Sequence, residues 1–388
     1  MSNTITSLIP DVYSALDVVS RELVGFIPAV TRDATTERAA LNQTVRSFVA
    51  PASTASDITP GVTPPDDGDQ TIGNVTLSIT KSKRVPFRWN GEQTLGVNNG
   101  GPGARAIQIN QIAQAMRTLT NLMEVDLATA AALGASRAYG TANTTPFASD
   151  LSDPANWRKI LSDNGAPLSD MQAVINTTAG AKMRTLAQLT KANEAGGNDM
   201  LRQGTLLDIH GFAFRESAGV VSPTIGTSNN AGTTDTTGYA IGATAITMAA
   251  AGTGTIIAGD IVTFTGDTNK YVVASGVASL AAGGVLTLAK PGLQKAIAAS
   301  NVTCTTVATS HRNIFFARTA LVLAARLPAL PDGGDLATDR TTVTDPRSGF
   351  SFEIAMYPQY RQMQYEISAA WGVAAVKAEH IGVALGEA

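Results

Sequence analysis

The sequence predicts an α+β fold in which a small antiparallel β-barrel or sandwich is inserted into a larger domain. Two patterns predict this class. One apolar stripe with the period of a helix face continues over about 30 residues, from about residue 104 to residue 136. Residues 223–309 carry almost no charge, and their short β-prone runs, about ten residues apart, are separated by glycine-containing turns.

The composition favours burial against other protein surfaces. The chain has 388 residues, a net charge of −3 and 15% charged residues, against about 25% in typical soluble domains. A general nucleic-acid binder would be basic. Obligate interfaces are depleted of charge, so a surface of this kind suits contact with other copies of the chain. The single cysteine, Cys304, excludes an intrachain disulfide and a multi-cysteine metal site, and we expect a buried, inert thiol.

The N-terminal region is predicted to be a helix followed by an extended arm. Apolar residues recur at helical spacing over residues 5–24, and Gly25 and Pro28 end the pattern. Residues 31–50 are mixed and polar, and residues 51–69 have no apolar period, which predicts an arm that stays extended or mobile until it is captured. The first residues lack the basic and apolar regions of a signal peptide, and no apolar run approaches the ~20 residues that span a bilayer. We therefore expect synthesis in a cytoplasm.

Residues 70–95 are predicted to form the two strands of a projecting hairpin. Val75, Leu77 and Ile79 alternate with polar residues, which is the period of a half-buried strand. A basic patch follows, made of Lys81, Lys83, Arg84 and Arg88. One interpretation is contact with an acidic patch on a neighbouring subunit. The other is a solvated strand edge, where lysine discourages edge-to-edge pairing.

The long helix is predicted to be a strut of about 45 Å, at 1.5 Å per residue. Shorter helices are expected at residues 155–161 and 179–190. Strands are expected at residues 174–176, 206–214, 245–248, 261–264, 271–274, 285–289, 302–307, 314–316, 321–326, 350–357 and 364–373, and residues 375–384 close the chain. In the insert, Asp267 to Lys270 is the one candidate for a charged tip that touches another subunit.

Motifs for catalysis or cofactor binding are weak. The three histidines, His210, His311 and His380, are far apart and form no metal-binding pair. The glycine pattern at residues 101–106 precedes a helix, but a turn stands where a dinucleotide-binding fingerprint needs a strand. The acidic run at residues 66–69 lacks the later glutamate of a calcium loop. We therefore expect no enzyme activity, no cofactor and no metal.

The order of these parts resembles the major capsid (coat) protein of tailed double-stranded DNA bacteriophages, and in particular the podovirus-type coat proteins with an inserted β-domain. The resemblance covers essentially the whole chain, and the order of the segments carries it more than any single motif. The matching segments are residues 8–10 (LIP), 21–25 (RELVG), 202–217 (RQGTLLDIHGFAFRES), 258–264 (AGDIVTF), 311–316 (HRNIFF) and 381–386 (IGVALG).

The resemblance implies a division of the chain into named parts. These are an N-terminal arm (1–50), a linker and E-loop (51–100), the spine helix of the P-domain (101–140), a P/A-domain segment (141–222), the inserted β-domain (223–309) and the closing strands (310–388). It implies a structural subunit of an icosahedral head that forms pentamers and hexamers around double-stranded DNA. The partners would be further copies, a scaffolding protein and a portal protein, in a virion assembled in the bacterial cytoplasm.

Two alternatives remain open. An encapsulin-like bacterial shell would share the fold but would not be expected to carry the inserted β-domain. A surface or adhesion protein could use residues 223–309 to bind glycan, but this segment has no tryptophan and only three other aromatic residues, Tyr239, Phe264 and Tyr271.

Overall fold

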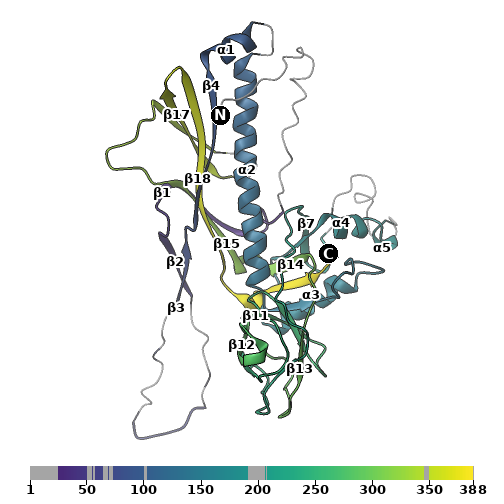
Figure 1. The fold of residues 1–388 in the computed structure, drawn as a ribbon. Coiled ribbons are helices and arrows are strands. Elements are labelled where there is room, and N and C mark those ends of the chain that lie inside the picture. Colours follow the sequence, from purple (N-terminus) through teal and green to yellow (C-terminus); the bar gives the residue numbers. More distant parts are fainter. Residues whose placement is uncertain are drawn as a thin grey trace.

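A computed structural model describes residues 25–49, 57–63, 73–99, 103–190, 208–344 and 349–387, together with residues 55, 69 and 206. The helix predicted at residues 5–24 lies outside this range, as do residues 66–68 and residues 101–102. Figure 1 shows a long central helix with a sheet beside its upper half, a second α/β region beside its lower half, and a β-domain below.

The long helix is confirmed as α2, Ala104–Leu133. Its C-terminal half is buried, and Leu119, Met123 and Leu127 have no exposed surface, whereas Ile109 near its start is 59% exposed. The buried half packs against strands of both large sheets, including Trp371 and Phe316 in one hydrophobic core. α2 ends at Gly134, where a Cβ atom would lie only 2.3 Å from that of Ala375.

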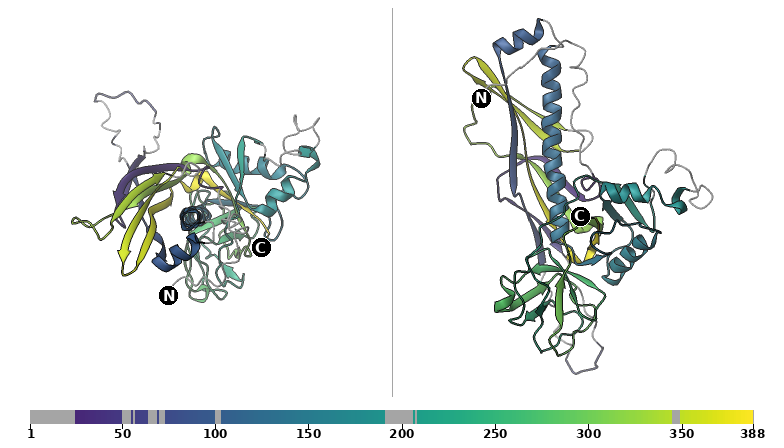
Figure 2. Two further views of the ribbon diagram at one scale, coloured as in Figure 1. Left: turned by 90° about the horizontal axis from the view of Figure 1, so that it is seen from above. Right: turned by 45° about the vertical axis from the view of Figure 1, so that its right-hand side comes forward.

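The sheet beside α2 has six strands. Their order is β1 (Thr31–Ala39), β15 (Leu321–Pro328), β18 (Gln362–Ala375), β17 (Ser351–Gln359) and β16 (Asp339–Thr344), and β4 (Lys81–Asn90) also pairs with β18. β1 pairs in parallel with β15. Residues 31–39, predicted as part of an extended or mobile arm, are therefore extended but already captured within the chain. The view from above shows this sheet curving around one side of α2 (Figure 2).

The hairpin predicted within residues 70–95 is wrong. β3 (Gly73–Ser78) pairs with β2 (Thr44–Val49), and β4 pairs with β18. The two residues between β3 and β4 are Ile79 and Thr80, which lack the glycine or asparagine of a two-residue hairpin turn. Ile79 is instead fully buried with Ala324 and Ala370 of the large sheet. We call β2 and β3 the ribbon; in the described residues these two strands pair only with each other.

The second sheet joins the P/A-domain segment to the inserted segment. Its order is β7 (Phe212–Glu216), β6 (Met171–Ile175), β14 (Arg312–Ala317), β19 (Ile381–Leu385), β5 (Arg137–Tyr139), β11 (Lys270–Ser275), β10 (Ile261–Phe264), β13 (Thr303–Thr306) and β8 (Gly232–Thr233). The 3-10 helices are η2 (Leu280–Ala282), η3 (Arg318–Ala320) and η4 (Ala378–His380). The strand predicted at residues 206–214 begins only at Phe212, because His210 and Gly211 turn the chain at positive φ.

The helix predicted at residues 155–161 is confirmed as α3 (Ser152–Asp163), whereas the single helix predicted at residues 179–190 is two helices, α4 (Thr177–Met183) and α5 (Ala187–Thr190). They surround a second core in which Trp157 stacks on Phe315 with ring centroids 5.3 Å apart. A further helix, α1 (Gly91–Asn98), was not predicted. Asn90 caps it by accepting a hydrogen bond from the Gln93 backbone, and the Gln93 side chain accepts one in return from the Asn90 backbone. This capping box was the available sequence signal.

The strands predicted between residues 223 and 309 all lie where the sequence places them, as β9 (Ala245–Met248), β10, β11, β12 (Gly284–Leu288) and β13. They enclose a core of their own that includes Phe264, Leu280 and Leu286. Cys304 lies fully buried in this core, and burial raises the pKa of its thiol to about 12. The limits of this and the other named domains stay a prediction. None of the helices described here is long and apolar enough to span a membrane.

Candidate subunit interface

The four basic residues predicted as an interface all lie on β4, a strand at the edge of the six-stranded sheet. Two of them have acidic partners within the chain. Lys81 Nζ lies 2.5 Å from Asp126 Oδ1 of α2, and the other Asp126 oxygen accepts a hydrogen bond from the Trp371 indole. Arg84 lies 2.7 Å from Glu366 of β18. These two side chains hold β4 to its own neighbours, which the sequence could not reveal because the acids lie 45 and 282 positions away.

Lys83 and Arg88 are exposed, as is Arg84. Lys83 forms no ion pair with any residue in the described ranges. Both remain accessible on an edge strand, so a contact with another subunit through them stays a prediction. The solvated-edge interpretation applies equally to Lys83.

Asp267 and Lys270 lie in the other sheet, far from β4. Asp267 accepts hydrogen bonds from the Asn269 backbone and side chain and from the Tyr271 hydroxyl. Lys270 begins β11, which pairs with β5 of the main body. Arg137 of β5 also donates a hydrogen bond to Asn269 at 2.6 Å. This turn therefore docks the insert onto its own chain, and its predicted contact with another subunit stays a prediction.

A groove that the sequence did not indicate lies at the far end of α2. It has a volume of about 990 Å³ and is formed where β4, α1, the start of α2 and the β17–β18 turn meet. Its floor is apolar: Trp89 is 8% exposed, and Tyr365 stacks on Phe87 with ring centroids 5.1 Å apart. The Trp89 indole donates a hydrogen bond to Gln111 of α2, so the floor is fixed.

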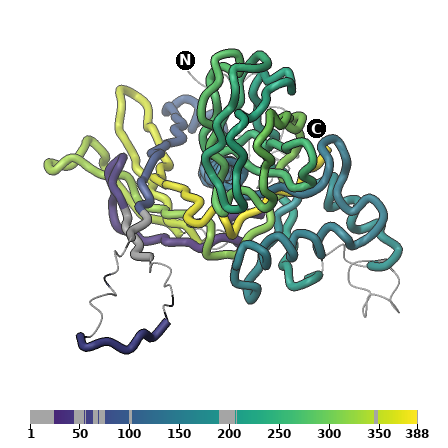
Figure 3. The backbone as a smooth tube through the Cα atoms, turned by 90° about the horizontal axis from the view of Figure 1, so that it is seen from below, coloured from purple at the N-terminus to yellow at the C-terminus, as the bar shows by residue number. Residues whose placement is uncertain are grey.

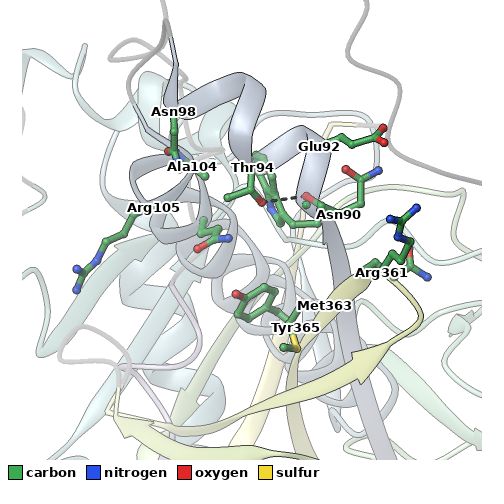
Figure 4. A pocket seen from close by; sticks show the side chains of 13 residues that line it. Asn90, Glu92, Thr94, Asn98, Ala104, Arg105, Arg361, Met363 and Tyr365 are labelled. Atoms are coloured by element: carbon green, nitrogen blue, oxygen red, sulfur yellow. Dashed lines mark hydrogen bonds between the residues drawn. The ribbon is translucent and has the colours of Figure 1, made fainter.

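Two arginines stand at the sides of this groove (Figure 4). Arg105 comes from the first turn of α2, and Arg361 comes from the β17–β18 turn. Among the described residues that line the groove, Glu92 of α1 is the only acidic one. Asn90, Thr94 and Asn98 add neutral hydrogen-bonding groups to the rim. The groove thus combines an apolar floor with a positive balance of charge.

The end of the ribbon has the opposite character. Residues 50–72, between β2 and β3, contain four aspartates, Asp57, Asp66, Asp67 and Asp69, and no lysine or arginine. In the described part of this loop, Ile58 is 97% exposed and Val62 is as exposed as in an extended chain. Figure 3 shows residues 57–63 standing away from the body. The loop therefore offers acidic and apolar side chains that nothing described in its own chain covers.

The described residues contain no cluster of histidine, cysteine, aspartate or glutamate that could hold a metal ion. The glycine pattern before α2 follows a helix, α1, and no strand is described there. The Ala104 backbone at the start of α2 donates a hydrogen bond to the Asn98 side chain. The described geometry around Gly103 thus serves the turn between two helices.

Comparison with known proteins gives the fold. No protein-family model and no curated protein matches the sequence. Among solved structures, the capsid of the cyanophage P-SCSP1u is similar with a TM-score of 0.52 and 11% sequence identity, covering 99% of this chain and 92% of that chain. The chain has a phage capsid fold. The structure of Mycobacterium phage Che8 is also similar, with a TM-score of 0.47 and 14% sequence identity over 98% of both chains. The structure of Gordonia phage Cozz is similar with a TM-score of 0.49 and 11% sequence identity, covering 97% of this chain and 91% of that chain.

The predicted fold class is thereby confirmed, an α+β capsid fold with a spine helix and an inserted β-domain. The E-loop predicted within residues 51–100 stays a prediction, and of the two ribbon strands only β3 falls within that range. α2 is the spine helix of this fold, and α1, which lines the groove together with the start of α2, lies at the distal end of that helix (Figure 1).

Proposed function

We propose that the protein is the structural subunit of an icosahedral bacteriophage head and that it assembles into pentamers and hexamers around double-stranded DNA. The observation that carries this proposal is that the ribbon loop and the groove have complementary surfaces but do not contact each other within one chain. The ribbon loop is acidic with exposed apolar residues, and the groove is basic with an apolar floor. Complementary charge and apolar surface favour their association.

The two surfaces cannot meet within one chain. The ribbon runs from the sheet toward the end of the molecule that holds the inserted domain, whereas α1, whose residues line the groove, lies at the opposite end (Figure 1). α2 alone, with 30 residues, spans about 45 Å between these ends. We infer that a loop of one copy reaches the groove of another, and a head-to-tail contact of this kind generates a ring when its rotation closes.

The finer parts of the proposal follow from the capsid fold. We propose a scaffolding protein and a portal protein as partners during assembly, the virion as the location, and the bacterial cytoplasm as the assembly site. The net charge of −3 agrees with a shell that encloses DNA without binding it tightly, since strong phosphate binding needs many lysine and arginine contacts. The role is structural and requires no catalytic group.

A charge-swap experiment tests the proposed contact. The double variant Arg105→Glu/Arg361→Glu should reduce assembly and leave the monomer folded, measured by sedimentation and circular dichroism. The double variant Asp57→Lys/Asp69→Lys should do the same. Combining all four substitutions should restore assembly, because each loop again meets a groove of opposite charge.

A matched control is the double variant Lys159→Glu/Lys182→Glu, which changes the net charge equally on exposed residues of α3 and α4. Loss of assembly in all variants without rescue in the combined one would contradict the loop-to-groove contact.

A further inference from the structure

A buried carboxylate in the middle of α2 joins three segments that are far apart in sequence. Glu124 has no exposed surface. One of its oxygens accepts hydrogen bonds from the backbone N–H groups of Gly25 at 2.5 Å and Phe26 at 2.7 Å. The same oxygen accepts one from the Ser217 hydroxyl at 2.7 Å, and the second oxygen accepts one from the Ile27 backbone at 3.0 Å.

Hydrogen bonds from these four donors offset the free-energy cost of burying the Glu124 carboxylate. A buried carboxylate is strongly unfavourable unless it is paired or hydrogen-bonded, and bonds to an ionised acceptor are among the strong ones. Within the described residues, no cation pairs with Glu124. Burial raises the pKa of Glu124, and the hydrogen bonds from Phe26, Ser217, Ile27 and Gly25 oppose that rise.

The donors mark two junctions of the chain. Gly25 to Ile27 is where residues 1–24 join the described body. Ser217 follows β7, on the path into the inserted β-domain. The two junctions are in close contact, since a Cβ atom on Gly25 would lie 2.7 Å from the Ser217 Cβ and 2.9 Å from the Glu216 carbonyl oxygen.

We propose that Glu124 is a positioning residue that fixes where residues 1–24 leave the body and holds this point against the segment that leads into the insert. Apolar packing of Phe26 and Ile27 in the main core also holds the segment. Packing alone does not orient three successive N–H groups, however, and the carboxylate does. The inference concerns the folded monomer and does not rest on shell formation.

Hydrogen exchange of the full chain, followed by mass spectrometry, tests the inference. Glu124→Gln keeps the shape of the side chain but places an NH2 group among N–H donors. We expect the amides of residues 25–27 to exchange about tenfold faster or more, as the loss of bonds to a charged group predicts. Glu353→Gln is the matched control, because Glu353 is equally buried on β17 but bonds to Arg38 and Arg340. It should leave residues 25–27 unchanged.

A second variant disturbs the contact between residue 25 and Ser217 without changing any charge. Gly25→Ala pushes the chain away from Ser217 and should raise exchange at residues 25–27 in the same direction. Trypsin should also cut after Arg21, and so remove residues 1–21, faster in both variants than in the wild type. Wild-type exchange at residues 25–27 in Glu124→Gln would show that apolar packing alone holds the junction, and would overturn the inference.

The pH dependence gives a further readout. Because the folded-state pKa of Glu124 is raised above its ordinary value of 4.5, the folded protein holds this proton more tightly than the unfolded chain. The stability of the wild type should therefore fall relative to Glu124→Gln as pH rises from 4.5 through the folded-state pKa. A difference that stays constant across this range would contradict a buried, titrating carboxylate at this junction.

Discussion

The inserted β-domain and the ribbon are both built from strands rich in small and uncharged residues, but they differ in how far their apolar side chains are buried within the chain. The insert buries its own apolar residues, among them Leu280, Leu286 and Cys304, which have no exposed surface. The ribbon ends in a loop whose Ile58 and Val62 are fully exposed. The difference teaches that the insert is completed by its own sequence, whereas the ribbon leaves apolar side chains uncovered, which we propose are covered by a second copy of the chain.

The largest expected effect concerns access to the core of the insert. With the thiol pKa raised from 9.0 to about 12, the thiolate population of Cys304 at pH 8 should be about a thousandfold lower than in the unfolded chain. Labelling by a thiol reagent should be slower by at least this factor in the native protein. Rapid labelling of native protein would show that the insert opens easily and is not self-sufficient.

The next effect is on stability. Leu286→Ala removes a fully buried side chain from the core of the insert and should lower the free energy of unfolding by about 2–5 kcal/mol. Urea denaturation followed by Cys304 labelling measures this loss at the insert itself. A loss well under 1 kcal/mol would mean that the insert core contributes little, and the contrast with the ribbon would weaken.

A smaller effect is expected at the β4 edge. The Arg84 side chain is 57% exposed in its pair with Glu366, so Arg84→Ala should cost only about 0.2–1 kcal/mol in the monomer. Chemical denaturation in low and high salt checks this, since salt should screen most of the difference. If assembly fails in this variant while the monomer stays stable, β4 contributes to the interface as the sequence predicted.

The smallest effect on the monomer is expected in the ribbon. Ile58→Ser/Val62→Ser changes two side chains with no partners among the described residues and should alter stability by no more than about 0.5 kcal/mol. The same variant should assemble poorly, as light scattering would show. Normal assembly would contradict the view that these residues are buried by a neighbour.

Much of the insert and of α2 could be predicted because their signals are local. Glycine turns mark the ends of β9 to β13, and one apolar stripe marks α2. β1 could not be placed, because its partner β15 begins about 290 positions later and parallel pairing leaves no turn signal. The β3–β4 boundary was misinterpreted although Ile79-Thr80 offers no hairpin turn.

The functional surfaces were harder to predict than the elements. The groove requires β4, α1, the start of α2 and the β17–β18 turn to converge, and no single segment of sequence records that. The four basic residues lie on one strand, β4, but the acids that neutralise Lys81 and Arg84 come from α2 and β18. Glu124 did leave a signal, since it falls on the buried face of α2 beside Thr120 and Ala128, where an unpaired charge demands a partner.

Electron microscopy of the purified full chain, expressed alone and together with its neighbouring genes, tests the central claim most directly. The account predicts closed or malformed shells tens of nanometres across, in which residues 50–72 of one copy lie in the groove beside Arg105 and Arg361 of another. A clean monomer in both preparations, with the ribbon still uncovered, would contradict it.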